Sequence, residues 1–308
     1  MKNWLKQQAE NYFGRWATPS VNGAIDGKLE QPYEIRMQLD EFEKSSDTER
    51  ASYWEAKFDA REFTERFDKA GIAVEQIEIN IKDFERWMSE NSALIADYGN
   101  MADVRIEKIL EHYLTLKYLD VKLDDIFIDV AAADSPFADL LRKKGMTAYS
   151  QDLVYPVGLR GCKIGSDAGR MPVNDRFADV LTLHCAYECF QGDGDIRFAR
   201  EASRILKKGG RLGIAPLYID TIHFVKTSPW SDKRKIDVER EARVLWRDDQ
   251  YKEPFSRHYS PESFVERIAC QMPEMEKKIL CFKNLDTLSE HFKGQRIYCH
   301  FMFKGVMA

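Results

Sequence analysis

Short apolar strands alternate with helices from Ala102 onward, and this alternation limits the possible folds more than any other feature of the chain. Strands are predicted in the segments DDIFIDVA, MTAYSQDL, FADVLTLHC and RLGIAPLYI. Helices are predicted in ADVRIEKILEHYLTLKYLDV, in SPFADLLRKKG and in DGDIRFAREASRILKKGG, the last ending at its two glycines. This order predicts an α/β fold, in which a parallel sheet carries helices on both faces. The last two strands, in KKILCFKNLD and QRIYCHFMFKGV, are joined by a modest loop and predict an antiparallel pair.

The first part of the chain, residues 1–100, predicts a helical and irregular extension in front of a domain over residues 101–308. Glycines and prolines interrupt YFGRWATPSVNGAIDGKLEQPYE, which predicts turns. The segment DTERASYWEAKFDAREFTERFDKAG has aromatic residues at helical spacing and predicts a helix that ends at Gly71. The helical pattern is predicted to continue through VEQIEINIKDFERWMSENSALIADYG. We interpret the aromatic stripe as core or as the face of a homodimer, rather than as a ligand site.

The composition excludes some classes of partner. A net charge of −5 over 308 residues argues against a broad nucleic-acid-binding face. The segment MKNWLKQQAENYF lacks the apolar core of a signal peptide, and no stretch reaches the roughly 20 apolar residues of a membrane span. Six cysteines form no CxxC pair, so we expect reduced thiols, a cytoplasmic location and no metal site.

Polar side chains follow the predicted strands. Ligands of open parallel sheets bind beyond the carboxyl ends of the strands, where the strand order reverses. The first strand ends at Asp129, and the second ends 23 residues later at Asp152, a spacing that suits a carboxylate binding two ribose hydroxyls. Asp167 lies in SDAGRMP, and the next strand leads into LHCAYECF with His184 and Glu188. Each has a structural alternative, since the carboxylates can be ordinary turn residues and the histidine can be a hydrogen-bonded core residue.

The run from Ala102 to Tyr218 resembles the core of class I S-adenosylmethionine-dependent methyltransferases, especially the small-molecule and sugar type. In that family an acidic residue is followed by a Gly-x-Gly-x-Gly turn, and IDVAAADSPFA aligns with it, with Ala131, Ala133 and Ser135 at the glycine positions. EASRILKKGGRLGIA resembles the family's helix, double-glycine turn and fifth strand. The resemblance covers about 110 residues directly and leaves the N-terminal third outside.

The resemblance implies a doubly wound Rossmann-like methyltransferase sheet, mostly parallel with a reversed last strand, and S-adenosylmethionine as cofactor. It implies that Asp152 holds the ribose and that the pair Asp167–Ala168 touches the adenine. The full set of cofactor-binding residues expected from the resemblance and from the strand ends is Asp129, Ala131, Ala133, Asp134, Ser135, Asp152, Asp167, Ala168 and His184.

The alanine-rich turn departs from the family pattern. An alanine in left-handed geometry costs about 1–2 kcal/mol, so the sequence predicts a turn with negative φ values and small methyl groups at the closest approach. S-adenosylmethionine carries no phosphate, so the turn need not present bare amides to an anion. Asp129 and Asp134 instead suit its sulfonium and ammonium charges. These carboxylates, together with the missing GxGxxG run, argue against a nicotinamide-dependent oxidoreductase.

Acceptor binding is predicted to involve an insertion at about 220–260. Loops of this length inside a compact domain are usually functional, although DKRKIDVEREARVLWRDD can also be a solvated surface helix. His184 and His223 follow the fourth and fifth strands and are the candidate general bases for an oxygen acceptor. The residues predicted to bind the acceptor are Glu188, Trp246, Arg257 and His258.

The function that the sequence favours is methyl transfer from S-adenosylmethionine to a small molecule or saccharide, as an O-methylation. The alternative is a catalytically inactive, methyltransferase-like binding or scaffold protein, with a dimer formed through the N-terminal region. The alanine-rich turn is the feature that keeps this alternative open.

Overall fold

The structure, a computed structural model, describes residues 44, 58–99, 101–227, 238–246 and 255–308. The chain divides into two compact units. The first, which we call the sheet unit, comprises residues 58–222 and 258–308, and the second, the small unit, comprises residues 1–57 and 223–257. No helix of the described residues has the length and apolar character that crossing a bilayer requires.

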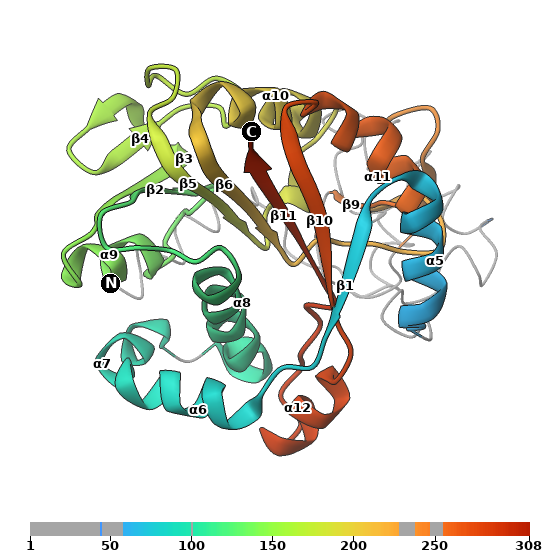
Figure 1. The fold of residues 1–308 in the computed structure, drawn as a ribbon, viewed down its shortest axis with the longest axis horizontal. Coiled ribbons are helices and arrows are strands. Elements are labelled where there is room, and N and C mark those ends of the chain that lie inside the picture. The colour runs from blue at the N-terminus through green and yellow to red at the C-terminus, as the bar shows by residue number, and fades with distance from the viewer. Residues whose placement is uncertain (1–43, 45–57, 100, 228–237, 247–254) are drawn as a thin grey trace, which may run out of the picture. The chain divides into compact units, whose positions relative to one another are not determined.

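The sheet unit is built on an eight-stranded sheet with the order β1-β10-β11-β6-β5-β2-β3-β4 (Figure 1). β2 pairs in parallel with β3 and β5, and β5 pairs in parallel with β6, whereas β11 is antiparallel to both β6 and β10. The strands are β1 (Ala73–Ile77), β2 (Ile126–Val130), β3 (Thr147–Arg160), β4 (Lys163–Gly165), β5 (Ala178–His184), β6 (Leu206–Ala215), β10 (Met275–Phe282) and β11 (Phe301–Met307). The predicted doubly wound sheet, mostly parallel with a reversed last strand, is therefore confirmed.

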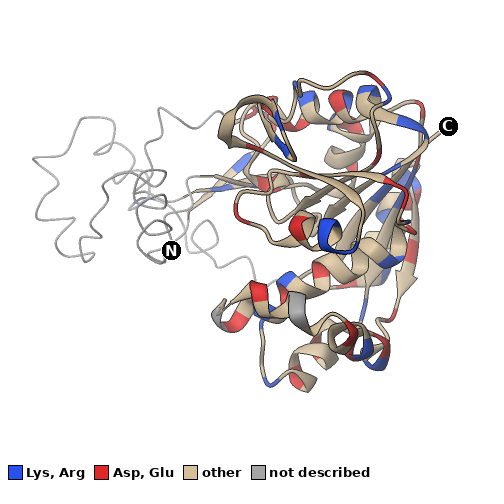
Figure 2. Ribbon diagram, turned by 90° about the vertical axis from the view of Figure 1, so that its left-hand side faces the viewer, with Lys and Arg blue, Asp and Glu red and all other residues tan. Residues whose placement is uncertain are grey.

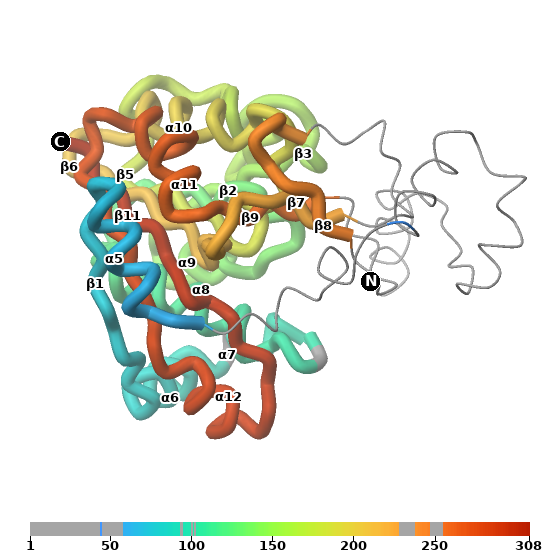
Figure 3. Tube along the Cα trace, turned by 90° about the vertical axis from the view of Figure 1, so that its right-hand side faces the viewer, coloured from blue at the N-terminus to red at the C-terminus, as the bar shows by residue number. Residues whose placement is uncertain are grey.

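Helices cover both faces of this sheet, because the central strands β2 and β5 are buried on both sides. One core joins the sheet to α5 (Ala60–Ala70), α10 (Gly194–Ile205) and α11 (Pro261–Arg267), and α5 lies beside α11 in Figures 1 and 3. The other core joins it to α6 (Ile81–Glu90), α8 (Arg105–Tyr118), α9 (Phe137–Lys143) and α12 (Leu285–His291). Short helical segments complete the unit: α7 (Ser92–Ile95), η3 (Ala96–Tyr98), η4 (Ala102–Val104), η5 (Tyr187–Cys189) and η7 (Ala269–Gln271).

Helix α5 begins and ends as its sequence dictates. The Asp59 carboxylate accepts hydrogen bonds from the backbone N–H groups of Arg61 and Glu62, which caps the first turn. Gly71 follows the last turn with a φ of +93°, a left-handed conformation that favours glycine. The predicted stop at Gly71 is confirmed.

Three sequence predictions are wrong in detail. The segment AVEQI, predicted as helix, is strand β1, because its backbone pairs in parallel with β10. The helix predicted to run to Gly209–Gly210 ends at Ile205, since Leu206 already pairs with Ala178 and Lys207 pairs with Asp179. The loop expected between the last two strands contains α12.

Strand β3 changes partner direction at Asp152. It pairs in parallel with β4 as far as Asp152 opposite Gly165, and its second half then runs back along β4, from Val157 opposite Gly165 to Arg160 opposite Lys163. Gly165 permits this, because a Cβ there would lie 2.1 Å from the carbonyl oxygen of Pro156. The strand thus leaves the central sheet at the position where the sequence predicted its end.

The domain boundaries differ from those expected. Residues 58–99 belong to the sheet unit rather than to a separate extension, because β1 joins the sheet and Phe84 of α6 is buried in its core. The predicted insertion at about 220–260 corresponds to residues 223–257 of the small unit. The N-terminal turns were predicted for residues 1–43 and 45–57, which lie outside the described residues. Of the aromatic stripe interpreted as core or as a homodimer face, Phe63 and Phe67 are buried in the core of the sheet unit.

The described part of the small unit contains β7 (Phe224–Thr227), β8 (Arg243–Trp246) and all but the last residue of β9 (Ser256–His258), and the strand order is β8-β7-β9. β7 and β8 are parallel. A surface helix was considered for DKRKIDVEREARVLWRDD. That alternative is wrong for the last part of the segment, because Arg243–Trp246 is a strand. Residues 228–237 lie outside the described residues.

Candidate functional site at the carboxyl ends of the strands

The alanine-rich turn after β2 is bonded to β3 through its own amides. The N–H of Ala131 donates to Oε1 of Gln151 at 3.1 Å, and the N–H of Ala132 donates to the Gln151 carbonyl at 2.9 Å. The N–H of Ala133 donates to Oδ2 of Asp152 at 2.8 Å. Three successive amides of the turn are therefore used by the protein itself.

Two alanines of this turn have left-handed backbone. The φ of Ala131 is +52° and that of Ala133 is +42°, so the prediction of negative φ values is wrong. The physical reason is that the hydrogen bonds from the three alanine amides to Gln151 and Asp152 hold the turn in this conformation. Each alanine costs about 1–2 kcal/mol in this geometry.

Glycine at either position is expected to be neutral or stabilising. Ala131→Gly and Ala133→Gly should each raise the free energy of unfolding by up to about 1 kcal/mol, because the relieved strain exceeds the added entropy of the unfolded chain. Ala132 is the matched control, since its φ is not positive, and Ala132→Gly should lower stability by about 0.5–1 kcal/mol. Urea denaturation of the three variants measures this. A loss in all three would contradict the assigned backbone.

Asp152 joins this turn to the bend in β3. Its Oδ2 accepts from Ala133 N–H, and its Oδ1 accepts from Val154 N–H at 3.0 Å. The side chain is buried. A carboxylate offers about four acceptor positions, so two remain for a ligand.

Asp129, His184 and Thr115 form a hydrogen-bonded row from β2 through β5 to α8. Nδ1 of His184 lies 3.1 Å from Oδ1 of Asp129, and its Nε2 lies 2.9 Å from Oγ1 of Thr115. Thr182 donates to the same Asp129 oxygen at 3.3 Å. The His184 side chain is 7% exposed and Asp129 is 1% exposed. Both ring nitrogens of His184 are thus engaged, which matches the structural alternative considered for it.

Asp167 lies on the segment that follows β4. The N–H of Ser166 donates to the Asp152 carbonyl at 3.3 Å, which brings this segment beside β3, and Ala168 is buried. Oδ2 of Asp167 pairs with Nη1 of Arg197 at 2.7 Å, and Oδ1 accepts from Gly169 N–H at 2.7 Å. Partial burial would raise the pKa of Asp167, but the Arg197 and Gly169 hydrogen bonds outweigh it and lower the pKa.

A cluster that the sequence did not predict surrounds the thiol of Cys185, directly after β5. Sγ lies 3.5 Å from Oε1 of Glu188, 3.6 Å from the Tyr218 hydroxyl and 3.7 Å from the Tyr298 hydroxyl. Helix α8 adds Lys108, which interacts with the thiol and whose Nζ lies 2.7 Å from Oε1 of Glu111. We call the following set the thiol-centred cluster: Glu107, Lys108, Glu111, Cys185, Glu188, Tyr218 and Tyr298.

The acids of this cluster titrate far from their ordinary range. Burial, and then the charge of Glu111, raises the pKa of Glu107 to about 8. Burial raises the pKa of Glu188 to about 7 and that of Glu111 as well. Burial, and then the charge of Glu188, raises the pKa of the Cys185 thiol to about 12. The thiol is therefore protonated and unreactive near neutral pH, and the carboxyl groups are the members that exchange protons there.

The remaining predicted residues fall mostly in the small unit. His223 and Arg257 both pair with Glu239: Nε2 of His223 lies 2.8 Å from Oε1, and Nε of Arg257 lies 2.7 Å from the same oxygen. These two partners outweigh burial and hold the pKa of Glu239 well below its usual range. Trp246 is buried in β8.

His258 belongs to the sheet unit, where its ring packs edge-on against Tyr218 with centroids 4.9 Å apart. The structure thus groups Asp129, Ala131, Ala133, Asp152 and Asp167 in the sheet unit, together with His184, Glu188 and His258. It groups His223, Trp246 and Arg257 in the small unit.

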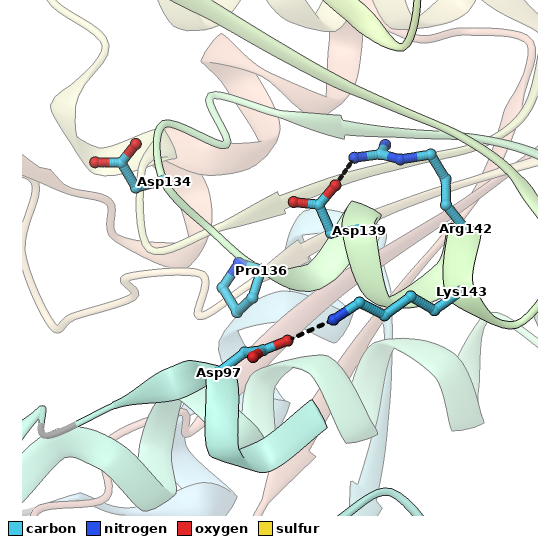
Figure 4. A pocket seen from close by; sticks show the side chains of 6 residues that line it. All are labelled: Asp97, Asp134, Pro136, Asp139, Arg142 and Lys143. Carbon is cyan, nitrogen blue, oxygen red and sulfur yellow. Dashed lines mark hydrogen bonds and ion pairs between the residues drawn. The ribbon is translucent and has the colours of Figure 1, made fainter. Parts of the chain in front are cut away.

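A surface hollow of about 540 Å³ borders the turn at Asp134 and Pro136 (Figure 4). Lys143 pairs with Asp97 at 2.8 Å across it, and Arg142 pairs with Asp139. Apart from Asp134, the lining residues are not among those predicted for the site. Because its exposed cations are already paired, we assign the chemistry to the strand ends instead.

The described residues carry mixed charges and no metal-ligand cluster. Lysine and arginine positions are interspersed with aspartate and glutamate along the described ribbon (Figure 2). Within the described ranges, no three His, Cys, Asp or Glu side chains are grouped so as to hold a metal ion.

Comparison with known proteins finds similarity only at the level of solved structures. No family model matches the sequence, and no curated protein matches it either. The 1,6-didemethyltoxoflavin-N1-methyltransferase of Burkholderia thailandensis, solved with 1,6-didemethyltoxoflavin and S-adenosylhomocysteine, is 11% identical, with a TM-score of 0.44. The match covers 72% of this chain and 88% of that one.

Two further structures are similar to the same extent. An S-adenosylmethionine-dependent methyltransferase from Mesorhizobium loti is 12% identical with a TM-score of 0.42, over 64% of this chain and 98% of that one. Another from Methanosarcina mazei is 12% identical with a TM-score of 0.40, over 62% of this chain and 96% of that one. At this level of similarity, we base the assignment of the fold on the strand order and register observed in the chain itself.

Proposed function

We propose that the chain is an S-adenosylmethionine-dependent methyltransferase acting on a small molecule. The observation that carries the proposal is that carboxylates lie at the ends of the strands, beside a turn whose backbone N–H groups already donate hydrogen bonds within the protein. A pyrophosphate needs free N–H groups at this turn, and Ala131, Ala132 and Ala133 all donate to β3. A cofactor with a sulfonium and an ammonium group needs carboxylates instead.

One carboxylate oxygen is available where such a cofactor would bind. Oδ2 of Asp129 is buried and has no hydrogen-bond partner in the described residues, although Oδ1 has two. A buried acceptor without a partner costs about 1–3 kcal/mol, and an ammonium group would satisfy it. This orphaned oxygen fits the proposed cofactor.

We assign the cofactor contacts residue by residue. Asp152 would hold the ribose hydroxyls with its two remaining acceptor positions, and Asp167 with Ala168 would contact the adenine. Asp129, Asp134 and Ser135 would hold the amino-acid end. The bound cofactor supplies an activated methyl group, so the protein's part is to orient the acceptor and accept its proton.

The chemical identity of the methyl acceptor is a more specific part of the proposal. The sequence favoured an oxygen of a small molecule or saccharide, with His184 or His223 as base and with Glu188, Trp246, Arg257 and His258 beside the acceptor. The engaged nitrogens of His184 support a positioning role instead, in which the ring holds α8 against the strand ends. The same feature, with the strained turn, keeps a non-catalytic binding protein as the second candidate.

Binding of S-adenosylmethionine and of S-adenosylhomocysteine is the expected result that tests the proposal. Either ligand in 100-fold excess over its dissociation constant should stabilise the fold by about 2.7 kcal/mol, which raises Tm by several degrees. Calorimetric titration gives the affinity independently of the melt. A flat titration and an unchanged melt would favour the second candidate.

Asp152→Ala is expected to lower both affinity and stability. The variant loses the ribose contacts, at about 1.5–3 kcal/mol of cofactor binding, and leaves the amides of Ala133 and Val154 without their acceptor. Asp152→Asn can keep one amide bond and should recover part of the stability but little of the affinity. Asp175→Ala is the control, because that exposed carboxylate pairs only at the surface with Arg204. Wild-type cofactor affinity in Asp152→Ala would remove Asp152 from the site.

A further inference from the structure

The alanine-rich turn is also held by a tyrosine that the sequence did not predict. The Tyr155 hydroxyl donates a hydrogen bond to the carbonyl oxygen of Ala133, and the N–H of the same alanine donates to Asp152. Ala133 is therefore fixed at both of its peptide groups by two side chains of β3 that lie three residues apart. These two bonds hold a left-handed backbone that alanine by itself disfavours.

The hairpin after Asp152 keeps the Tyr155 ring in place. Beyond Tyr155 the strand runs back along β4, from Val157 opposite Gly165 to Arg160 opposite Lys163. Nζ of Lys163 lies 4.5 Å from the centre of the Tyr155 ring, within reach of a cation–π attraction. Tyr155 is half-buried, although most of its neighbours in the hairpin are exposed. The ring is thus held from β4 while its hydroxyl reaches the turn.

The hydroxyl of Tyr155 lies among carboxylates. Burial raises its pKa, and the charges of Asp152, Asp129 and other nearby aspartates raise it further. The phenol therefore remains a neutral hydrogen-bond donor well above neutral pH. A lysine or arginine could also donate to the Ala133 carbonyl, but its charge would repel the sulfonium and ammonium groups of the proposed cofactor. Tyrosine holds the turn without this repulsion.

We propose that Tyr155 is a positioning residue, which holds the alanine-rich turn in the conformation that receives the amino-acid end of the cofactor. The inference rests on the proposed methyltransferase function and adds a residue to its site. Tyr155 acts through Ala133 and does not itself contact the cofactor. Without its hydroxyl the turn populates other conformations, and the apparent affinity falls with the fraction of protein that keeps the binding conformation.

Two ligands that differ only at the amino-acid end test this role. S-adenosylhomocysteine and 5′-methylthioadenosine share the adenine, the ribose and the thioether, but only the first has an amino-acid group. We expect Tyr155→Phe to raise the dissociation constant of S-adenosylhomocysteine about five- to tenfold, the scale of one neutral hydrogen bond, and that of 5′-methylthioadenosine by less than about twofold. Calorimetric titration of the full-length protein measures both constants.

The matched control is Tyr149→Phe, which removes a hydroxyl from the first half of the same strand. The Tyr149 ring packs against Phe177 with centroids 5.4 Å apart, and this variant should leave both dissociation constants unchanged. Amide hydrogen exchange gives a second readout that needs no ligand. Exchange of the Ala133 N–H should be about five- to tenfold faster in Tyr155→Phe than in the wild type, because the turn opens more often, and unchanged in Tyr149→Phe.

The outcomes separate this inference from the proposed function. If Tyr155→Phe binds S-adenosylhomocysteine as tightly as the wild type, the positioning role is overturned while the methyltransferase proposal stands. Equal weakening of both ligands overturns it too, because that result indicates a general effect on the fold. Unchanged exchange at Ala133 would show that the hydroxyl does not hold the turn. If the wild type binds neither ligand, the proposed function fails, and this inference fails with it.

Discussion

Asp129→Ala is expected to lower the free energy of unfolding by about 2–4 kcal/mol and to abolish measurable cofactor binding. The substitution removes the acceptor of two buried donors, Nδ1 of His184 and Oγ1 of Thr182, and each unsatisfied donor costs about 1–3 kcal/mol. It also removes the orphaned oxygen proposed to meet the cofactor's ammonium group. Urea denaturation and calorimetric titration measure the two effects.

Two comparisons make this result specific. Asp129→Asn keeps an oxygen that can accept both hydrogen bonds, so it should retain most of the stability while it loses the charge and the affinity. Asp139→Ala removes an exposed acid paired with Arg142 on α9, and its stability should stay within about 0.5 kcal/mol of the wild type. If Asp129→Ala is as stable as Asp139→Ala, the row from Asp129 to Thr115 does not hold the strand ends together.

Stability is expected to fall as the pH rises through neutrality, and Glu107→Gln is expected to remove most of that fall. The pKa of Glu107 is about 8 in the folded protein and about 4.5 in the unfolded chain, so between these values the folded state binds more protons. Stability therefore decreases with rising pH, by about 1 kcal/mol between pH 7 and pH 8 for this group and by less for Glu188. Over the whole window between these two pKa values, the loss of stability is on the order of 5 kcal/mol for this group.

The interval from pH 7 to pH 8 isolates these carboxyl groups. Burial lowers the pKa of His112, so this group makes stability rise with pH. That rise is essentially complete above the unfolded histidine pKa of about 6.5, so it does not affect the interval from pH 7 to pH 8. The lowered pKa values of Asp167 and Glu239 act only in acid, where stability is lost as the pH falls. Glu107→Gln should flatten the pH profile, and Glu266→Gln should not. An unchanged profile in Glu107→Gln would contradict the burial of Glu107 beside Glu111. The groups that face Glu107 and Glu111 include Tyr98, Lys108, His184, Cys185, Glu188, Tyr298 and the Cys299 thiol.

The sequence predicted the central sheet because its strands carry apolar residues at most of their buried positions. In β2 and β5 the run is nearly continuous, and the helices between them have ordinary lengths. Strand β1 was missed for the opposite reason. It pairs through its backbone at the end of the sheet, most of its side chains are exposed or half-buried, and AVEQI has no two-residue alternation to reveal it.

The candidate site was predictable only where it lies on strand ends. The positions of Asp129 and Asp152 could be predicted because each lies where an apolar strand ends, and a polar residue there lies at the carboxyl edge of the sheet. The polar residues of α8 could not be placed in this way. Glu107, Glu111 and Thr115 recur every four residues, a spacing that reads as a solvated face, but the helix is buried on nearly all sides. Only their position among Ile109, Leu110 and Leu114 hinted that this face points inward.

The backbone conformation of the turn could not be predicted from the sequence, for a different reason. Residue type predicts left-handed φ where glycine or asparagine stands, and Ala131 and Ala133 are neither. Their conformation is imposed by three hydrogen bonds to Gln151 and Asp152, which are long-range contacts that local preference does not encode.

The outer strands of the sheet are short. β1 has five residues, and at the other end β4 lies between residues 150–152 and the returning residues 157–160 of β3, so this return is the outer strand. An outer strand offers unpaired N–H and C=O groups on which a strand of another molecule can assemble. So short a return offers few such groups, and Lys163 of the adjacent β4 adds a positive charge nearby, with its Nζ 4.5 Å from the centre of the Tyr155 ring. Intermolecular strand addition is thereby opposed at this end, and lengthening the hairpin of residues 157–165 is a route to aggregation without loss of the fold.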